Sequence, residues 1–200
     1  MIETMSPEMT AREAVMACIR DRRSVGRVTD ELPPRELIEE ILEAASWAPC
    51  HHVTEPWRFT VVTGDARVAF GEVMARSKLD RMVVQGRSVE GEAEKLVAKA
   101  LRAPVIVAVA VEPAAGPKIV EVEEIEAGGA AVQNLLLAAH AAGLATIWRT
   151  GDPAYDPRVR EFLGLSERAT IVGFVYVGYA AIEPSRAKKT PASAVTTWLS

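Results

Sequence analysis

The chain has 200 residues, a formal net charge of −4 and two cysteines. Its length suits one domain with a sizeable core, and an apolar content of 49% is ordinary for a globular protein. The negative charge gives no reason to expect a nucleic-acid partner, which would call for a basic face. The N-terminus lacks the basic and apolar regions of a secretory signal, which favours a cytoplasmic protein with reduced thiols.

The first predicted helix follows a loose lead-in over residues 1–10. Thr10 can cap this helix, with Glu13 completing a capping box. Apolar residues at helical spacing predict one buried face, formed by Ala14, Val15, Cys18 and Ile19. The helix ends in the basic run 20–24. From charge alone, a solvated helix end is the favoured interpretation. The alternative is an anion site, because guanidinium groups and a hydroxyl suit phosphate oxygens.

A second amphipathic helix begins at Pro33-Pro34 and ends near Trp47, because Pro49 cannot continue it. The loop that follows carries Cys50-His51-His52. A metal site is disfavoured, because adjacent ligands rarely converge on one ion and no second ligand pair completes the set. A Cys50–His51 catalytic dyad is disfavoured as well, since neighbours in sequence usually point apart. A loop histidine that hydrogen-bonds a ligand is the better functional interpretation.

The middle of the chain predicts two strands and two helices. Residues 58–63 form a strand and 66–74 a helix, while 93–101 form a second helix. The run of residues 104–111 has no polar alternation, which predicts a strand buried on both faces near the centre of its sheet. Between these elements, residues 76–92 are polar and without a clear period, and we expect a mobile excursion that forms a lid or a substrate wall.

The stretch Glu123–Gly151 is the most distinctive part of the sequence, because it carries no formal charge between Glu126 and Arg149. A surface helix would show a polar face, so we expect a helix buried on nearly all sides, capped by Gly143. The short strand after it ends in Arg149-Thr150-Gly151. A polar cluster at the end of a buried strand is a common location for a binding site.

The rest of the chain predicts a short helix that begins at Pro157 and a long buried strand over residues 170–179. Residues 181–200 show little sign of a packed element. We expect either a frayed tail or an arm that crosses onto a neighbouring subunit, and Trp198 favours docking slightly. The chain as a whole is predicted to be a single domain over residues 1–200.

Three motifs, in order and at matching separations, resemble the FMN-dependent nitroreductase family in its short-chain branch. These motifs are Arg22-Arg23-Ser24, then Ala48-Pro49-Cys50-His51 with Pro56-Trp57, then Ile147-Trp148-Arg149-Thr150-Gly151. Each is weak alone, but together with the elements between them they cover nearly the whole chain. The resemblance implies an α+β fold (an α/β sandwich) with a mixed central sheet flanked by helices. It also implies an intertwined homodimer with one FMN at each subunit interface.

The resemblance also implies roles for individual residues. Arg22, Arg23 and Ser24 would hold the phosphate and ribityl end of FMN, and His51 would come from the partner subunit. Trp148, Arg149 and Thr150, with Gly151 beside them, would line the cofactor. Residues 138–143 match a segment that binds the nicotinamide nucleotide in that branch. In the dimer, the long helix would pack against its symmetry mate, with close approach permitted at residues 128–131.

Two residues depart from the pattern of the family. Glu55 stands where relatives often have Asn or Gln, and a carboxylate near the flavin would resist negative charge on the reduced ring. Trp47 replaces an arginine that contacts the flavin in the short-chain branch, although its indole could stack on the ring. The predicted cofactor-binding residues are therefore Arg22, Arg23, Ser24, Trp47, His51, Glu55, Trp148, Arg149, Thr150 and Gly151, with no metal ligand.

The predicted function is an FMN-dependent NAD(P)H oxidoreductase that reduces nitroaromatic, quinone or other electron-poor small molecules in a ping-pong cycle. The cofactor carries the chemistry, so the sequence requires no specific catalytic acid or base. The sequence does not choose between NADH and NADPH. One alternative is a flavin-binding homodimer with little reductase activity, acting as a carrier, sensor or scavenger. Another is a dimeric scaffold that has lost its flavin.

Overall fold

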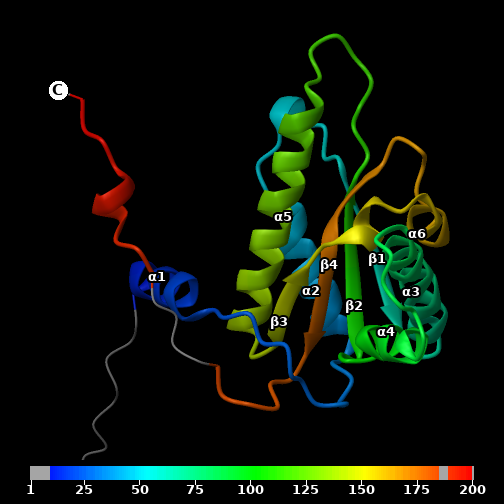
Figure 1. Ribbon diagram of the computed structural model, residues 1–200. Coiled ribbons are helices and arrows are strands. Elements are labelled where there is room, and N and C mark those ends of the chain that lie inside the picture. The colour runs from blue at the N-terminus through cyan, green and yellow to red at the C-terminus, as the bar shows by residue number, and fades with distance from the viewer. Residues whose placement is uncertain (1–9, 185–188, 200) are drawn as a thin grey trace, which may run out of the picture.

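A four-stranded sheet forms the centre of the computed structural model, which describes residues 10–184 and 189–199 (Figure 1). The strand order is β1-β2-β4-β3. The strands are β1 (Trp57–Thr63), β2 (Val105–Val111), β3 (Ala145–Arg149) and β4 (Thr170–Gly178). All three neighbouring pairs are antiparallel. The prediction of a mixed sheet is therefore wrong for these strands. Their one parallel contact among the described residues is an isolated bridge between Ser24 and Thr146, at the free edge of β3.

Helices cover both faces of this sheet, which confirms the predicted α+β sandwich (Figure 1). One face carries α2 (Arg35–Ser46) and α5 (Glu121–Ala141), and the other carries α3 (Ala66–Val84), α4 (Glu92–Ala100) and α6 (Pro157–Phe162). The two central strands, β2 and β4, are thus enclosed from both sides. This enclosure explains their continuous apolar sequences without parallel neighbours.

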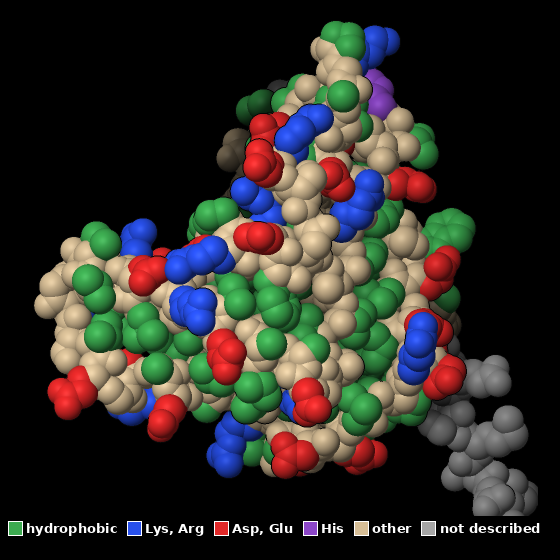
Figure 2. Space-filling view, turned by 90° about the vertical axis from the view of Figure 1, so that its right-hand side faces the viewer, with side chains coloured by type: hydrophobic (Ala, Val, Ile, Leu, Met, Phe, Trp, Pro, Cys, Tyr) green, Lys and Arg blue, Asp and Glu red, His purple; other side chains and the backbone are tan. Residues whose placement is uncertain are grey.

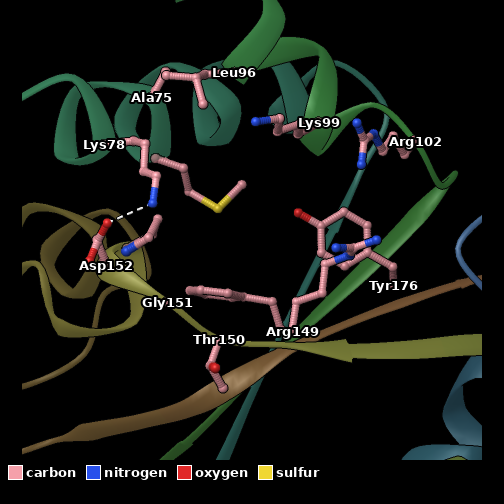
Figure 3. Close-up of a pocket in the computed structure, with 13 residues that line it drawn as sticks. Ala75, Lys78, Leu96, Lys99, Arg102, Arg149, Thr150, Gly151, Asp152 and Tyr176 are labelled. Carbon is pink, nitrogen blue, oxygen red and sulfur yellow. Dashed lines mark hydrogen bonds and ion pairs between the residues drawn. The ribbon is translucent and has the colours of Figure 1, made fainter. Parts of the chain in front are cut away.

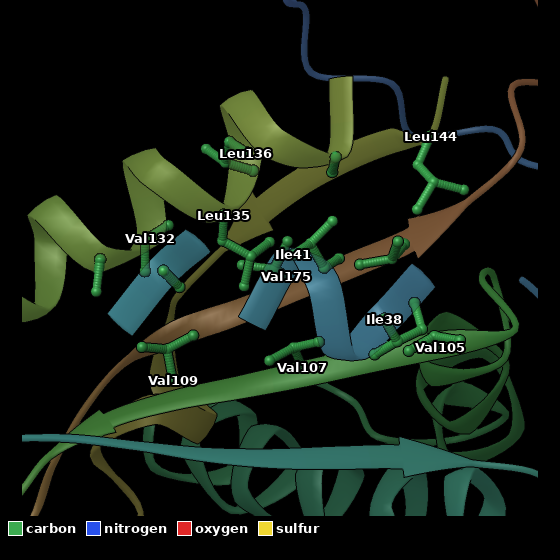
Figure 4. Packing of buried hydrophobic residues seen from close by; sticks show 14 of the residues in the cluster. Ile38, Ile41, Val105, Val107, Val109, Val132, Leu135, Leu136, Leu144 and Val175 are labelled. Atoms are coloured by element: carbon green, nitrogen blue, oxygen red, sulfur yellow. The ribbon is translucent and has the colours of Figure 1, made fainter. Parts of the chain in front are cut away.

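Two hydrophobic clusters hold the layers together. The first joins α2 and α5 to the sheet, with Ile41, Leu135 and Val175 fully buried at its centre (Figure 4). The second lies under α3 and α6. There the ring of Phe70 stacks on Phe162 at 5.6 Å between centroids and meets the edge of Phe174 at 5.5 Å. Aromatic contacts of this kind add to the free energy gained by burial.

The long helix α5 forms as predicted, and its sheet-facing side is buried. At its end, Gly143 has a φ of +77°, and the N–H groups of Gly143 and Leu144 donate to the carbonyls of His140 and Ala139 at 3.1 and 2.8 Å. This is the Schellman arrangement that glycine favours. The opposite side of the helix is open within one chain, where Gln133 is exposed. Its own chain therefore covers one side of the helix, and the predicted burial on nearly all sides would need a second subunit on the other.

The predicted mobile excursion at residues 76–92 is wrong for residues 76–84, which are helical, while residues 85–91 form the connection to α4. Helix α3 continues to Val84, and Met74, Ser77 and Met82 are buried on its inner side. Gly86, with a φ of +69°, ends the helix by the same type of cap as Gly143, because the N–H of Arg87 donates to the carbonyl of Met82 at 2.9 Å. The charged residues Arg76, Asp80 and Arg81, which suggested a loop, are exposed on the outer side of this helix.

Helix α1 (Ala11–Asp21) begins with the predicted capping box between Thr10 and Glu13. Its apolar side is not buried within one chain, which contradicts the prediction: Val15 is 57% exposed and Ile19 is 50% exposed. The helix packs against α5, where the Cys18 thiol donates to the carbonyl of Leu137 at 3.4 Å.

The C-terminal segment extends away from the sheet and its helices, past α1 in the view of Figure 1. Its 3-10 turn η3 (Ala192–Val195) has no buried residue, and Trp198 is 89% exposed. The predicted lead-in, except Thr10, lies outside the described residues. No helix in the described ranges has the length and apolar character that a membrane crossing requires.

Candidate functional site

The basic segment after α1 lies along the free edge of β3. Ser24 forms the isolated bridge to Thr146, and the N–H of Val25 donates to the carbonyl of Thr146 at 2.9 Å. The Arg22-Arg23-Ser24 motif is therefore held at the same strand that ends in Arg149-Thr150-Gly151. The structure brings together two motifs that are far apart in the sequence.

The two arginines of this segment differ in their surroundings. The guanidinium of Arg23 donates to the backbone carbonyls of Arg20 and Arg22, where it caps the end of α1. The Nε of Arg22 is buried and has no hydrogen-bond partner among the described residues. Leaving a buried donor without a partner costs free energy of folding. The Nε of Arg22 is therefore a candidate donor to a bound ligand.

Arg149 and Trp148 point to opposite faces of the sheet, as neighbours on a strand do. The guanidinium of Arg149 lies over the ring of Tyr176, 5.7 Å from its centroid, and its Nη2 lies beside Gly26. Burial raises the pKa of the Tyr176 phenol, while the charges of Arg149 and Arg102 act in the opposite direction. Arg149 is thus positioned between the basic segment and a pocket on the side of α3 and α4.

The indole of Trp148 lies on the opposite face of the sheet from Arg149, where it packs against a β-bulge in β4. The register between β2 and β4 shifts next to Val109, and Val172 is left unpaired. The Nε1 of Trp148 donates to the carbonyl of Val172 at 3.2 Å, and the indole fills the space that a Cβ on Gly173 would need. A bulge often re-aims a side chain in this way.

A pocket of about 280 Å³ lies between the end of β3 and the helices α3 and α4 (Figure 3). Arg149, Thr150 and Gly151 line its floor. The residues that the sequence did not predict are basic side chains from the two helices and the turn after them, together with a phenol from β4: Lys78, Lys99, Arg102 and Tyr176. Four cations therefore surround the pocket, against one carboxylate, that of Asp152.

That carboxylate is already paired. Asp152 accepts from Lys78 Nζ at 2.8 Å and lies 3.7 Å from Arg81 Nε. The hydrogen bond from Lys78 holds the pKa of Asp152 below its ordinary value. Lys99, Arg102 and Arg149 form no ion pair among the described residues, so the pocket keeps an excess of positive charge. On this side of the molecule, basic and acidic side chains are otherwise intermingled (Figure 2).

The other three predicted residues, Trp47, His51 and Glu55, lie away from this pocket. Their loop packs on the first turns of α5, where Thr54 bonds to Glu124, while α1 meets the same helix at Leu137. These two points are about 20 Å apart along the helix at 1.5 Å per residue. One chain therefore does not bring the two halves of the predicted site together.

The exposed loop leaves its polar groups near the surface. Trp47 is 78% exposed, and its Nε1 donates to Glu43 at 3.0 Å. His51 borders a shallow depression against Glu123, Glu126 and Ala130 of α5. The Cys50 sulfur accepts from the N–H of Glu55 at 3.4 Å. In the described part of the chain, no group of three or more potential metal ligands gathers.

The segment 138–143 forms the last turn of α5 and its Schellman end. Ala139 is fully buried in the core, and none of these residues lines the basic pocket. The exposed residues of the segment 138–143 are small and apolar.

The chain is similar to known proteins over most of its length. YdjA of Escherichia coli (strain K12), which carries the name of an NAD(P)H nitroreductase, is 33% identical over 175 residues, covering 86% of this chain and 91% of YdjA. YfhC of Bacillus subtilis (strain 168), with the same kind of name, is 30% identical over 178 residues, covering 86% of this chain and 88% of YfhC.

Solved structures show the same fold. A nitroreductase-like family protein from Bacillus cereus superposes with a TM-score of 0.80 at 26% identity, covering 98% of this chain and 99% of the other. A nitroreductase from Desulfovibrio desulfuricans, solved in complex with FMN, superposes with a TM-score of 0.73 at 28% identity and the same coverage. The sequence also matches the Nitroreductase family over residues 19–179. The chain therefore belongs to the Nitroreductase family.

Proposed function

We propose that the chain is an FMN-dependent NAD(P)H oxidoreductase that reduces nitroaromatic, quinone or other electron-poor small molecules. When bound, FMN would accept hydride from NADH or NADPH and pass electrons to the acceptor in a ping-pong cycle. Membership of the family supports the class of enzyme. The observation that carries the proposal for this chain is the convergence of Arg22, Arg149 and the basic pocket at one strand.

The residues of this strand and its neighbours fit FMN. The unpartnered Nε of Arg22 and the guanidinium of Arg149 offer charge-assisted donors to a phosphate, and Ser24 adds a hydroxyl. Thr150 and Gly151 follow the end of β3 and line the same pocket as Arg149. Lys99 and Arg102 would place positive charge beside the flavin ring, which favours negative charge on it.

The proposal includes a homodimer. The apolar side of α1 and the outer side of α5 are uncovered within one chain, as is the C-terminal segment with Trp198. A second copy related by a two-fold axis would cover all three, because a surface of this kind must match itself. It would also bring His51, Glu55 and Trp47 of one subunit toward the pocket of the other. A cytoplasmic location is part of the same proposal.

The first test is the visible spectrum of the purified protein. Bound oxidised flavin gives a yellow protein, and mass spectrometry of the released ligand should identify FMN. Protein that stays colourless and binds no FMN after reconstitution would rule the proposal out. Arg22→Ala should lower FMN affinity severely, because the phosphate loses a buried donor.

A flavin-binding dimer with little reductase activity is the second candidate. The exposed Trp47 and the free carboxylate of Glu55 motivate it, because both differ from the family pattern at the cofactor. Anaerobic stopped-flow mixing separates the candidates. Rapid loss of flavin absorption with NADH or NADPH supports the oxidoreductase, and a stable oxidised spectrum supports the binder.

A further inference from the structure

The loop that carries His51 has an unusual backbone. His52, Val53 and Glu55 all have positive φ angles, of 53°, 53° and 46°. None of them is glycine, and Val53 is β-branched, so the left-handed conformation is unfavourable for each. Val53 is also exposed and gains no compensating burial. Such a backbone persists only where its surroundings hold it, and it is frequent at ligand-binding sites.

The strongest restraint on this loop is a buried carboxylate. Glu124, in the first turn of α5, is 1% exposed. One of its oxygens accepts from the Thr54 hydroxyl at 2.7 Å, and the other accepts from the N–H of Ala114 at 3.2 Å. Glu124 thus connects the His51 loop, the segment after β2 and the helix itself.

This carboxylate has no ion-pair partner among the described residues. A buried carboxyl group is expensive and needs hydrogen bonds to compensate for its lost hydration. Here its two oxygens accept from groups of two other segments. An apolar residue would fill the same space without tying these segments together, so the carboxyl group points to a role in holding the loop.

We propose that Glu124, acting through Thr54, is a positioning residue that fixes the strained loop so that His51 is presented to the cofactor of the partner subunit. This inference rests on the proposed function, because it assumes FMN at the subunit interface. This Thr54–Glu124 contact, called the clamp below, ties the loop between α2 and β1 to the first turn of α5. Its loss would free His51 to move without removing any side chain from the cofactor itself.

The test compares FMN dissociation constants of the full-length protein and its variants. Thr54→Val removes the hydroxyl and keeps the shape of the side chain. It should weaken FMN binding about tenfold, the effect of losing one hydrogen bond to a charged group. Glu124→Gln should have a similar effect, because an amide cannot accept from both donors. Thr54→Ser should retain wild-type affinity. The matched control Thr60→Val on β1 should also retain wild-type affinity, because the hydroxyl of Thr60 makes no side-chain hydrogen bond among the described residues.

A double-mutant cycle distinguishes positioning from general destabilisation. If Thr54 acts through His51, Thr54→Val should cause no further loss of affinity in a His51→Ala background. An equal loss in both backgrounds, or no loss in either, would overturn the proposed role.

Hydrogen exchange separates failure of this inference from failure of the proposed function. In apo protein, the amides of residues 51–55 should exchange faster in Thr54→Val than in the wild type or Thr60→Val. Unchanged exchange refutes the clamp, whether or not FMN binds. A wild-type protein that binds no FMN refutes the proposed function and the role toward the cofactor. Faster exchange in that case would show that the clamp holds the loop for another purpose.

Discussion

Arg149 fills the space above Gly26: a Cβ built on Gly26 would lie 3.3 Å from the Nη2 of Arg149. Gly26 follows the Arg22-Arg23-Ser24 motif by two positions, and Arg149 ends β3. The absence of a side chain at one position thus allows the cation of the other to reach the basic segment. This contact joins the two motifs into one candidate phosphate site.

The contact predicts a graded effect of substitutions at Gly26. Gly26→Ala should lower FMN affinity only a few-fold, because the flexible end of Arg149 can shift by a few tenths of an ångström. Gly26→Leu should displace the guanidinium and lower FMN affinity on the order of tenfold to a hundredfold, the effect of one charge-assisted hydrogen bond or more. Fluorescence titration of FMN measures both. Equal affinities for the leucine variant and the wild type would place Arg149 outside the phosphate site.

The two arginines at the end of α1 should not be equivalent. Arg22→Ala should cause the larger loss of FMN affinity, because its buried Nε has no hydrogen-bond partner in residues 10–184 and 189–199. Arg23→Ala should mainly lower the free energy of unfolding, by roughly 1 kcal/mol, because Arg23 bonds to carbonyls at the helix end. FMN titration and urea denaturation of both variants give the comparison. The reverse order of effects on FMN would contradict this assignment.

Neighbouring glycines of α5 provide a matched pair. A Cβ on Gly128 would lie 2.8 Å from a methyl group of Val172 and closer still to Val111, whereas a Cβ on Gly129 meets nothing within 4 Å. Gly128→Ala should therefore destabilise the chain by about 1–3 kcal/mol, the usual range for overpacking. Gly129→Ala should leave the stability of the chain unchanged or raise it. Thermal unfolding of the two variants tests the difference.

The small residues of α5 also matter for the predicted dimer. Gly128 and Ala131, predicted to meet the symmetry mate, pack against the sheet of their own chain, which leaves Gly129 and Ala130 for the partner. Gly129→Glu should weaken the dimer and FMN binding together, because the cofactor is expected between subunits. Analytical ultracentrifugation and FMN titration follow the two effects. A monomeric variant that keeps full FMN affinity would disprove their coupling.

A pH dependence of stability should come from Asp156. The hydrogen bonds from Arg158 hold the pKa of Asp156 at about 2, below the ordinary value of 3.8. Because the folded pKa is depressed, the stabilisation is complete above about pH 4 and is lost as the pH falls toward 2. Asp156→Asn should cost roughly 1–2 kcal/mol at neutral pH and flatten this part of the profile. Urea denaturation between about pH 2 and pH 6 measures it. Asp65→Asn serves as the control, since Asp65 is exposed and makes no cap bond.

Sequence patterns predicted the elements with the strongest local signals. The uninterrupted apolar runs of β2 and β4 and the cap at Gly143 are local features, and the structure confirms them. The end of α3 was missed because Gly86 and the polar residues before it indicate a loop, although Met74, Ser77 and Met82 supply a buried side. Helix α1 shows another limit of sequence patterns. Its periodicity correctly indicates an apolar side, but it does not say whether that side is buried by its own chain or by another.

The candidate site was predictable where motifs carry it and not where it depends on tertiary contacts. Arg149, Thr150 and Gly151 belong to a motif. Lys99 and Arg102 resemble an ordinary solvated helix end, and only the packing of α4 against the end of β3 makes them part of the pocket. The pairing of Lys78 with Asp152 joins residues that are 74 positions apart, which no local pattern indicates.

The most direct test of the account is anaerobic mixing of FMN-loaded protein with NADH and, separately, with NADPH, followed by visible absorption. The account predicts rapid loss of the flavin absorption with at least one of the two, and its return when a nitroaromatic or a quinone is added. Flavin that stays oxidised with both donors, in protein shown to bind FMN, would contradict the proposed oxidoreductase activity.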